Sequence, residues 1–367
     1  MPVKIRALEA FLVEVEYREP FTISLGTSVK ARNVVVKLAS DDGSFGLGEA
    51  SPSPKIVGDD VDLVVETLRR AWRELKGVEI EGPEAFAEVL GRVSGSPSAK
   101  AALEMSFLDL WCKGLGVPLY RILGGYRRTV ETDITIGIMS PEEQAKRAVA
   151  YVEMGFKSIK LKLGLEPEVD VERVKAVRDA VGEGVRIRVD ANQGWSVDEA
   201  KRVIDRISNY DVELVEQPVK WDDIRGLAEV RRESPIPIAA DESVKSLADA
   251  IAVIKAEAAD VINIKLMKCG GPWQALKLAA VSEAAGVKNM IGCMGETGLA
   301  ITAGVHVALA LRNIKYIDLD SDLLLAERLV MEGGAYCDRG IRGVPERPGL
   351  GILKINEGLL KPLLKLG

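Results

Sequence analysis

Three carboxylates recur at a regular interval through the middle of the sequence. Asp190, Glu216 and Asp241 each end a short apolar run, and the two steps between them are 26 and 25 residues long. One strand and one helix fit each step, so we expect the three carboxylates at the same height on adjacent strands. Converging carboxylates repel one another unless a cation neutralises them. Because all three donors are oxygen atoms, the pattern predicts a hard divalent ion, with Mg²⁺ favoured over Mn²⁺.

Lysines flank this group of carboxylates. Lys162 ends the apolar run before Asp190, and Lys265 follows Asp241 by 24 residues. Lys160 and Lys162 share one face of their strand, which in a barrel points inward, where a lysine is costly unless it is paired or functional. An amine with a lowered pKa can remove the weakly acidic proton next to a carboxylate, and a divalent cation stabilises the resulting enediolate. Two lysines on opposite faces predict removal on one face and return on the other, which is racemisation or epimerisation.

Taken singly, these residues have structural alternatives. A carboxylate at a strand end is more often a helix cap than a metal ligand, and a lone lysine in a strand is usually a solvated edge charge. Five such residues on five successive predicted strands argue against coincidence. The only histidine, His306, lies in the apolar run TAGVHVALAL, where we expect it to pack in the core. This argues against histidine-rich metal sites and histidine-based catalysis.

The two ends of the chain lack the regular alternation of strands and helices that is predicted for the middle. Strands are predicted at 3–17 and 31–39, a hairpin turn at 41–46, and helices at 60–76, 83–93 and 97–114. Ser96 or Ser98 is expected to cap the last of these helices. We therefore predict an N-terminal α+β capping domain at 1–125. Residues 325–367 are rich in glycine and proline and are predicted to return to this domain.

Between residues 126 and 324, short apolar strands alternate with amphipathic helices. Strands are predicted at 132–137, 158–164, 185–190, 212–218, 236–242, 260–266, 288–294 and 314–320. Helices fit between them at 141–154, 168–181, 197–209, 222–232, 246–257, 272–286 and 298–310. This α/β pattern predicts a closed, modified TIM barrel of the (β/α)7β type, whose C-terminal strand ends converge on one mouth. An open doubly wound sheet is the rival fold, but neither of the phosphate loops GxGxxG and GxxxxGKS/T occurs.

Composition and chain pattern limit the partners and the compartment. A formal charge of −6 argues against nucleic acid as a partner. No apolar run reaches the roughly 18 residues of a membrane span, so no membrane partner is predicted. The start of the chain lacks the pattern of a signal peptide, and the four cysteines form no CxxC pair. We therefore expect a cytoplasmic protein without structural zinc or a disulfide framework.

Along nearly its whole length, the chain resembles the enolase superfamily, and within it the muconate-lactonizing-enzyme subgroup. The motifs that carry the resemblance are KLKLG at 160–164, VDANQGW at 189–195, VEQP at 215–218, ADES at 240–243 and NIKLMKCGG at 263–271. The resemblance implies that Asp190, Glu216 and Asp241 bind one Mg²⁺ per subunit, that Lys162 and Lys265 are the acid/base pair, and that Lys160 helps to hold the charge of the substrate carboxylate. It also implies a homo-oligomer.

The last predicted strand ends in IDLD, which is similar to the motif of dipeptide epimerases, typified by L-Ala-D/L-Glu epimerases. This likeness implies that Asp318 and Asp320 bind the α-ammonium group of a dipeptide, and two inward carboxylates do attract a cation. The implied activity is inversion of the α-carbon of the C-terminal residue through an enediolate. An ordinary strand end with helix capping stays open as the structural alternative for this pair.

The predicted pocket for the epimerised side chain departs from the Glu-specific epimerases. Those enzymes carry an arginine in the N-terminal loop, whereas Gly26 stands at the matching position here. Ile56, Gly295, Thr297 and Gly298 are the other predicted contacts, and the two glycines are smaller than expected. We expect a roomier and less cationic pocket that favours a neutral or hydrophobic side chain.

Other activities on the same scaffold form the alternatives. An o-succinylbenzoate synthase or an N-acylamino-acid racemase would keep the lysines and the carboxylates. Their substrates have no free ammonium group for Asp318 and Asp320 to bind, which disfavours both, and muconate cycloisomerase is disfavoured for the same reason. A non-catalytic relative should have lost a ligand or a base, and this chain retains all of them.

Overall fold

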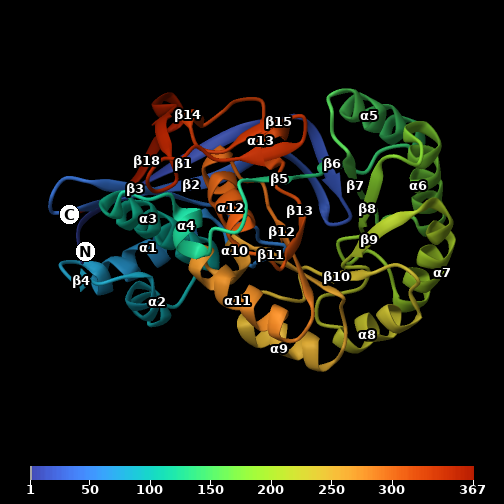
Figure 1. The fold of residues 1–367 in the computed structure, drawn as a ribbon, viewed down its shortest axis with the longest axis horizontal. Coiled ribbons are helices and arrows are strands. Elements are labelled where there is room, and N and C mark those ends of the chain that lie inside the picture. The colour runs from blue at the N-terminus through green and yellow to red at the C-terminus, as the bar shows by residue number, and fades with distance from the viewer. Residues whose placement is uncertain (1) are drawn as a thin grey trace.

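The structure, a computed structural model, describes residues 2–367. An antiparallel sheet and its helices lie at one end of the molecule, and a ring of parallel strands and helices forms the other end (Figure 1). The first part comprises β1 (Val3–Ile23), β2 (Gly26–Ser40), β3 (Phe45–Ala50), α1 (Val61–Leu75), β4 (Glu79–Ile80), α2 (Pro83–Gly91) and α3 (Pro97–Leu115). The three helices and the first two strands match the predicted ones, although β1 and β2 extend several residues further as a long hairpin. Strands β3 and β4 had not been predicted.

Helix α3 packs so closely on the sheet that two positions in β3 require glycine. A Cβ atom on Gly48 would lie 2.0 Å from the Ala102 carbonyl oxygen, and one on Gly46 would lie 2.0 Å from the Ser106 carbonyl oxygen. The side chain of Ser96 accepts a hydrogen bond from the Ala99 N–H, which confirms Ser96 as the N-cap of α3. This close packing fixes the position of β3. Glu49, which follows Gly48 in this strand, points toward the barrel.

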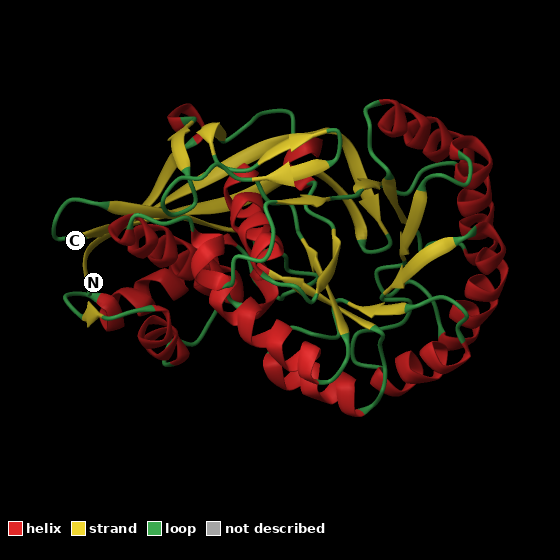
Figure 2. Cartoon of the chain, viewed as in Figure 1, coloured by secondary structure: helices red, strands yellow, loops and turns green. Residues whose placement is uncertain are grey.

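The middle of the chain forms eight parallel strands surrounded by an arc of helices (Figure 2). The strands are β6 (Ile134–Ile136), β7 (Ser158–Lys162), β8 (Arg186–Asp190), β9 (Val212–Glu216), β10 (Ile238–Ala240), β11 (Val261–Lys265), β12 (Lys288–Gly292) and β13 (Ile314–Ile317). The helices are α5 (Pro141–Glu153), α6 (Pro167–Val181), α7 (Val197–Ile207), α8 (Ile224–Glu233), α9 (Leu247–Lys255), α11 (Pro272–Ala284) and α12 (Gly298–Ala310). The predicted (β/α)7β order is confirmed.

The closure of the barrel corrects one expectation. Among residues 2–367 the strand ladder runs from β13 to β6 without joining these two end strands. Instead, the Asp133 N–H donates to the Ile317 carbonyl at 3.2 Å, and Arg188 Nη1 donates to the same carbonyl at 3.1 Å. Arg188 Nη1 also binds Asp133 Oδ2 at 2.8 Å. Arg188, which extends from β8, therefore binds both the residue just before β6 and the end of β13, where the ladder stops.

The inward faces of the barrel strands divide into two layers. Leu214, Ala239, Val261 and Met290 form a buried apolar cluster of their own, with Tyr316 packed against it. Side chains two residues further along a strand point the same way, one step nearer the C-terminal mouth. Glu216 and Asp241 follow the cluster at this spacing, so the sequence alternation places charged groups above an apolar floor.

The last part of the chain is richer in strands than predicted. It contains the turn-like helix α13 (Ser321–Leu324) and the strands β14 (Val330–Gly333), β15 (Tyr336–Asp338), β16 (Ile341–Gly343), β17 (Ile352–Ile355) and β18 (Lys361–Leu366). Strand β18 pairs antiparallel with β1, with Leu366 opposite Leu8. The boundaries at 125 and 324 stay a prediction. In the part of the chain that the structure describes, no helix has both the length and the apolarity to cross a membrane.

His306 is a buried residue of α12, and its side chain lies against the short helix α4 (Leu119–Leu123) and the C-terminal segment. Its Nδ1 accepts the Tyr120 N–H at 3.0 Å, and its Nε2 lies 3.3 Å from the Leu350 carbonyl oxygen. Nδ1 is therefore the acceptor and Nε2 carries the proton. This histidine joins three segments of the core, as its apolar surroundings in the sequence predicted.

We expect His306 to make folding stability depend on pH below neutrality. Burial lowers the pKa of His306 from 6.5 to about 4, so between these values the unfolded chain binds a proton that the folded chain does not. Its contribution is complete above pH 6.5 and falls by about 3 kcal/mol as the pH drops through this window. Chemical denaturation of the protein and of His306→Gln at several pH values should show a shallower pH dependence for the variant. Equal slopes would contradict this assignment.

Candidate active site

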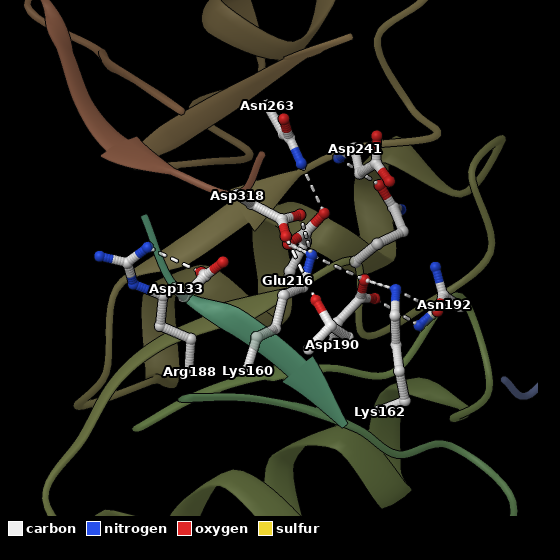
Figure 3. A network of polar contacts seen from close by, with 12 residues as sticks. Asp133, Lys160, Lys162, Arg188, Asp190, Asn192, Glu216, Asp241, Asn263 and Asp318 are labelled. Carbon is white, nitrogen blue, oxygen red and sulfur yellow. Dashed lines mark hydrogen bonds and ion pairs between the residues drawn. The ribbon is translucent and has the colours of Figure 1, made fainter. Parts of the chain in front are cut away.

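Three buried carboxylates converge at the C-terminal ends of adjacent barrel strands (Figure 3). Asp190 and Glu216 end β8 and β9 and lie opposite each other in the ladder, and Asp241 directly follows β10. One carboxylate oxygen of each lies within 4.8 Å of the corresponding oxygens of the other two. The parallel register thus brings together three residues that the spacing predicted to meet.

Lys160 is the buried cation beneath this group. Its Nζ lies 2.7 Å from Glu216 Oε2, 2.7 Å from Asp318 Oδ2 and 3.2 Å from Asp190 Oδ2. The side chain points into the barrel from β7, as the alternation of that strand predicted (Figure 3). Lys160 therefore links two of the converging carboxylates, Asp190 and Glu216, to Asp318, which directly follows β13.

Lys162 and Lys265 approach the carboxylates from strands on either side of them. Lys162 Nζ donates to Asp190 Oδ2 at 2.6 Å and to Asn192 Oδ1 at 3.0 Å. Lys265 Nζ donates to Asp241 Oδ2 at 2.7 Å. Both lysines are buried and both line the same cavity. Two amines are thus available to one substrate molecule, which is the arrangement that a two-base proton transfer requires.

The charges of the site shift one another's proton affinities. Burial raises the pKa of Glu216 to about 7, and the charge of Asp190 adds to this shift. Burial alone would raise the pKa of Asp190, but Lys162 and Lys160 outweigh it and hold the pKa below its usual range. Burial alone would lower the pKa of Lys160 and Lys265, and here the carboxylates outweigh it and raise both pKa values. Such mutual shifts are typical of functional sites.

Asp318 and Asp320 are buried just beyond the end of β13, beside β6. The Thr135 N–H donates to Asp320 Oδ2 at 2.6 Å, and Cys293 Sγ lies 3.6 Å from Asp320 Oδ1. Lys160 holds the pKa of Asp318 at about 2 against the effect of burial. Burial raises the pKa of Asp320 to about 6, and the charge of Asp318 adds to the shift. Asp320 has only neutral hydrogen-bond donors among the described residues, so a cationic ligand group would stabilise it.

A cavity of about 200 Å³ opens at this end of the barrel under the β1–β2 hairpin. Lys162, Lys265, Asp318 and Asp320 all line it. Its apolar lining comes from Tyr17, Phe21, Ile23, Ile56, Met294 and Leu324. The cavity therefore places the amines and the paired aspartates around one space, with apolar side chains on the remaining walls.

The predicted pocket residues divide between the cavity wall and the layer behind it. Ile56 and Gly295 line the cavity, and a Cβ atom on Gly295 would lie 2.6 Å from the Tyr17 hydroxyl. The structure does not bring Gly26, Thr297 or Gly298 to the lining. Gly26 lies at the turn of the hairpin, and Thr297 and Gly298 begin α12. Their predicted contact with the substrate stays a prediction.

Three residues for which the sequence predicted no role complete the charge network. Lys268 is buried, and its Nζ binds Asp241 Oδ1 at 2.5 Å and the Asn263 carbonyl at 3.0 Å. Asn192 Nδ2 donates to the buried Glu242 at 3.1 Å while Asn192 Oδ1 accepts from Lys162. Lys268 lies one helical turn after Lys265 in the NIKLMKCGG motif, and Asn192 and Glu242 adjoin predicted ligands. Extending the search by one turn past each strand end would have found all three.

The converging carboxylates fit a hard divalent ion. Asp190, Glu216 and Asp241 offer oxygen donors only, which suits Mg²⁺ better than softer metals. Glu216 Oε2 is buried and accepts no hydrogen bond, although Lys160 Nζ lies 2.7 Å away. This oxygen already pairs with Lys160, so a bound ion would compete with that lysine for it. When bound, the ion would supply electrostatic stabilisation for negative charge that develops on a substrate carboxylate.

Two family models match the chain. Residues 7–124 match the mandelate racemase / muconate lactonizing enzyme N-terminal domain, and residues 143–357 match the enolase C-terminal domain-like family. Together they account for both the antiparallel sheet and the barrel.

Curated relatives align along nearly the entire chain. The L-Ala-D/L-Glu epimerase of Bacillus subtilis is 41% identical over 98% of this chain and 99% of its own length. The hydrophobic dipeptide epimerase of Enterococcus faecalis is 40% identical over 95% of this chain and 99% of its own length. The N-succinyl-L-Arg/Lys racemase of Bacillus cereus is 34% identical over 98% of both chains. These relatives are epimerases and a racemase, which confirms the prediction of an isomerase.

Solved structures show the same fold. The substrate-liganded L-Ala-D/L-Glu epimerase of Bacillus subtilis superimposes with a TM-score of 0.94 at 40% identity, over 96% of this chain and 99% of that one. The dipeptide epimerase of Enterococcus faecalis, complexed with Mg and L-Leu-L-Tyr, has a TM-score of 0.91 at 39% identity, over 95% and 99%. The domain matches, the relatives and the structures agree, and the chain belongs to the mandelate racemase / muconate lactonizing enzyme family of the enolase superfamily.

Proposed function

We propose that this protein is a divalent-metal-dependent dipeptide epimerase that inverts the α-carbon of the C-terminal residue. Asp190, Glu216 and Asp241 hold the ion, for which Mg²⁺ is preferred and Mn²⁺ is the substitute. Lys162 and Lys265 remove and return the α-proton on opposite faces of an enediolate. A cation among the carboxylates would compete with both ammonium groups for these oxygen atoms, and a base needs its amine free of such pairing.

The observation that carries the proposal is the pair of buried aspartates in the same cavity as the two lysines. Asp318 is neutralised by Lys160, whereas within residues 2–367 the Asp320 carboxylate is bound only by the Thr135 N–H and the Cys293 thiol. A ligand with a primary ammonium group supplies the missing charge and several N–H donors. A dipeptide carries that group and a carboxylate at its other end, so it can span from Asp320 to the ion.

The apolar wall of the cavity supports a neutral or hydrophobic C-terminal residue. Two cationic residues, Lys30 and Arg32, also belong to the lining. Their charged groups bind Glu14, with Lys30 Nζ at 3.1 Å and Arg32 Nε at 3.0 Å from Glu14 Oε1. Glu14 also pairs with Lys361 at 2.9 Å, so its single negative charge offsets only part of the positive charge of Lys30 and Arg32, and a glutamate side chain would find less positive charge than the residue count suggests.

Deuterium incorporation tests the proposal. The protein is incubated with Mg²⁺ in D₂O and a set of L-Ala-L-Xaa dipeptides, and mass spectrometry and chiral chromatography follow the C-terminal residue. We expect α-deuteration with inversion, faster for hydrophobic residues than for glutamate. If no dipeptide in the set exchanges its α-proton, the proposed function is wrong.

The relative that acts on N-succinyl-L-Arg/Lys supports a second candidate, an N-acylamino-acid racemase on the same scaffold. N-succinyl and N-acetyl amino acids have no α-ammonium group, so derivatives of neutral amino acids leave Asp320 without a cation. They belong in the same exchange assay as matched controls. Turnover of these compounds in place of dipeptides would mean that the inference from Asp318 and Asp320 is wrong while the family assignment stands.

Replacing Asp320 by asparagine is expected to raise KM for a dipeptide by roughly tenfold to a hundredfold, because a charge-assisted hydrogen bond to the substrate ammonium is lost. The kcat value should change much less, since the lysines and the carboxylates remain. Asp322→Asn is the matched control, because Asp322 lies two residues further on, pairs with Arg342 and does not line the cavity. Steady-state kinetics of both variants measure this difference. If Asp320→Asn and Asp322→Asn have equal KM values for the dipeptide, Asp320 does not bind the substrate.

A further inference from the structure

Two buried glutamates reach from the capping part of the molecule into the barrel. Glu49 lies in β3, and Glu104 lies in α3. Each binds backbone N–H groups in the first turn of a barrel helix, α12 for Glu49 and α11 for Glu104. A carboxylate at this position satisfies free N–H groups and interacts favourably with the helix dipole. Here the capping residue comes from a distant segment of the chain.

Glu49 makes four hydrogen bonds and is fully buried. Its Oε1 accepts from the Thr297 N–H at 2.8 Å and from Asn33 Nδ2 at 2.7 Å. Its Oε2 accepts from the Thr297 hydroxyl at 2.7 Å and from the Ala300 N–H at 2.9 Å. This single side chain therefore binds β2 and the start of α12 at the same time.

The segment that Glu49 holds is the loop from Cys293 to Thr297. Cys293, Met294 and Gly295 of this loop line the cavity. Asn33 Nδ2 also donates to the Gly295 carbonyl at 2.8 Å, so the amide bound by Glu49 fixes the backbone of the lining itself. The close approach of the Tyr17 hydroxyl to Gly295 leaves this wall little room to shift.

We propose that Glu49 is a positioning residue for substrate binding, which holds the 293–297 loop against the capping sheet so that this wall of the cavity is formed in advance. The inference rests on the proposed function, because it assigns the cavity to the substrate. A wall that must be ordered on binding costs affinity, whereas a preformed wall does not. Glu49 touches neither the lysines nor the three carboxylates, so its effect is on binding and on side-chain preference.

Glu104 is the matched control within the same chain. It is also buried, and its Oε1 accepts from the Trp273 N–H at 2.7 Å and from the Gln274 N–H at 3.4 Å. The segment that it holds does not line the cavity. Loss of either carboxylate should destabilise the fold to a similar degree, and only loss of Glu49 should alter the cavity wall.

Steady-state kinetics of Glu49→Gln and Glu104→Gln test the proposal. A glutamine at position 49 places an amide NH₂ among three N–H groups and a hydroxyl that all donate to Glu49, so the loop loses part of its anchor. We expect KM for the preferred dipeptide to rise about tenfold in Glu49→Gln with kcat within about threefold, and KM to stay within about twofold in Glu104→Gln. Thr297→Val should repeat the effect of Glu49→Gln, and Thr297→Ser, which keeps the hydroxyl, should restore KM.

Backbone hydrogen exchange measured by mass spectrometry separates this inference from the proposed function, because it needs no substrate. In Glu49→Gln we expect faster exchange across residues 294–300, and in Glu104→Gln across residues 271–275. If Glu49→Gln leaves the 294–300 exchange rates unchanged, or if both variants raise KM equally, the positioning role is overturned. If exchange changes as expected but no dipeptide is turned over by the native protein, the proposed function fails and the mechanical role of Glu49 stands.

Discussion

Replacing Lys162 or Lys265 by alanine is expected to reduce epimerisation by roughly a thousandfold or more, because each amine serves one face of the α-carbon. Each variant should keep exchange of the α-proton for one diastereomer of the dipeptide, namely the one whose proton faces the remaining lysine. The two variants should therefore retain opposite diastereomers. Incubation of L,L- and L,D-dipeptides in D₂O, followed by mass spectrometry, measures all four combinations.

The two lysine variants act as controls for each other. Lys162 and Lys265 bind different carboxylates, Asp190 and Asp241, so a general collapse of the site would abolish exchange with both diastereomers in both variants. Retained exchange with the same diastereomer in both variants would contradict the assignment of one lysine to each face. Unchanged epimerisation in either variant would remove that lysine from the reaction.

Removing the divalent ion with a chelator is expected to lower the rate by roughly a thousandfold or more, with recovery on addition of Mg²⁺. The same ion should raise the melting temperature, because it binds the folded state and relieves the repulsion among Asp190, Glu216 and Asp241. Glu216→Gln should diminish both effects while keeping the fold, since a glutamine can still accept the Asn263 Nδ2 hydrogen bond seen at 2.7 Å. Activity assays and thermal unfolding with and without Mg²⁺ measure the two effects.

Glu213→Gln is the control for the metal experiment. Glu213 lies on the same strand as Glu216, at its opposite end, where it binds Arg188 Nε at 2.7 Å. This variant should lose some stability and keep the full Mg²⁺-dependent rise in melting temperature. A diminished rise in Glu213→Gln together with a full rise in Glu216→Gln would place the ion elsewhere.

The sequence alone was sufficient for the fold class and for the central residues of the site. Strand and helix periodicities are local properties, and a repeat of one strand and one helix leaves a single regular way to arrange the ends of the strands. Asp190, Glu216 and Asp241 could therefore be placed together from their spacing, and Lys160 and Lys162 could be placed inside the barrel from the alternation of one short strand.

What only the tertiary structure decided concerns contacts between residues far apart in the chain. The bond from Thr297 to Glu49 joins positions separated by 248 residues, and no local pattern in either segment encodes it. The same holds for Tyr17 and Phe21, which line the cavity from the first strand, and for Arg188, which bridges the barrel strands where the ladder stops. Gly26, Thr297 and Gly298 lie outside the cavity lining, and their contact with the substrate stays a prediction. Periodicity specifies which way a side chain faces along its own strand or helix, and only packing of the whole chain specifies what it meets there.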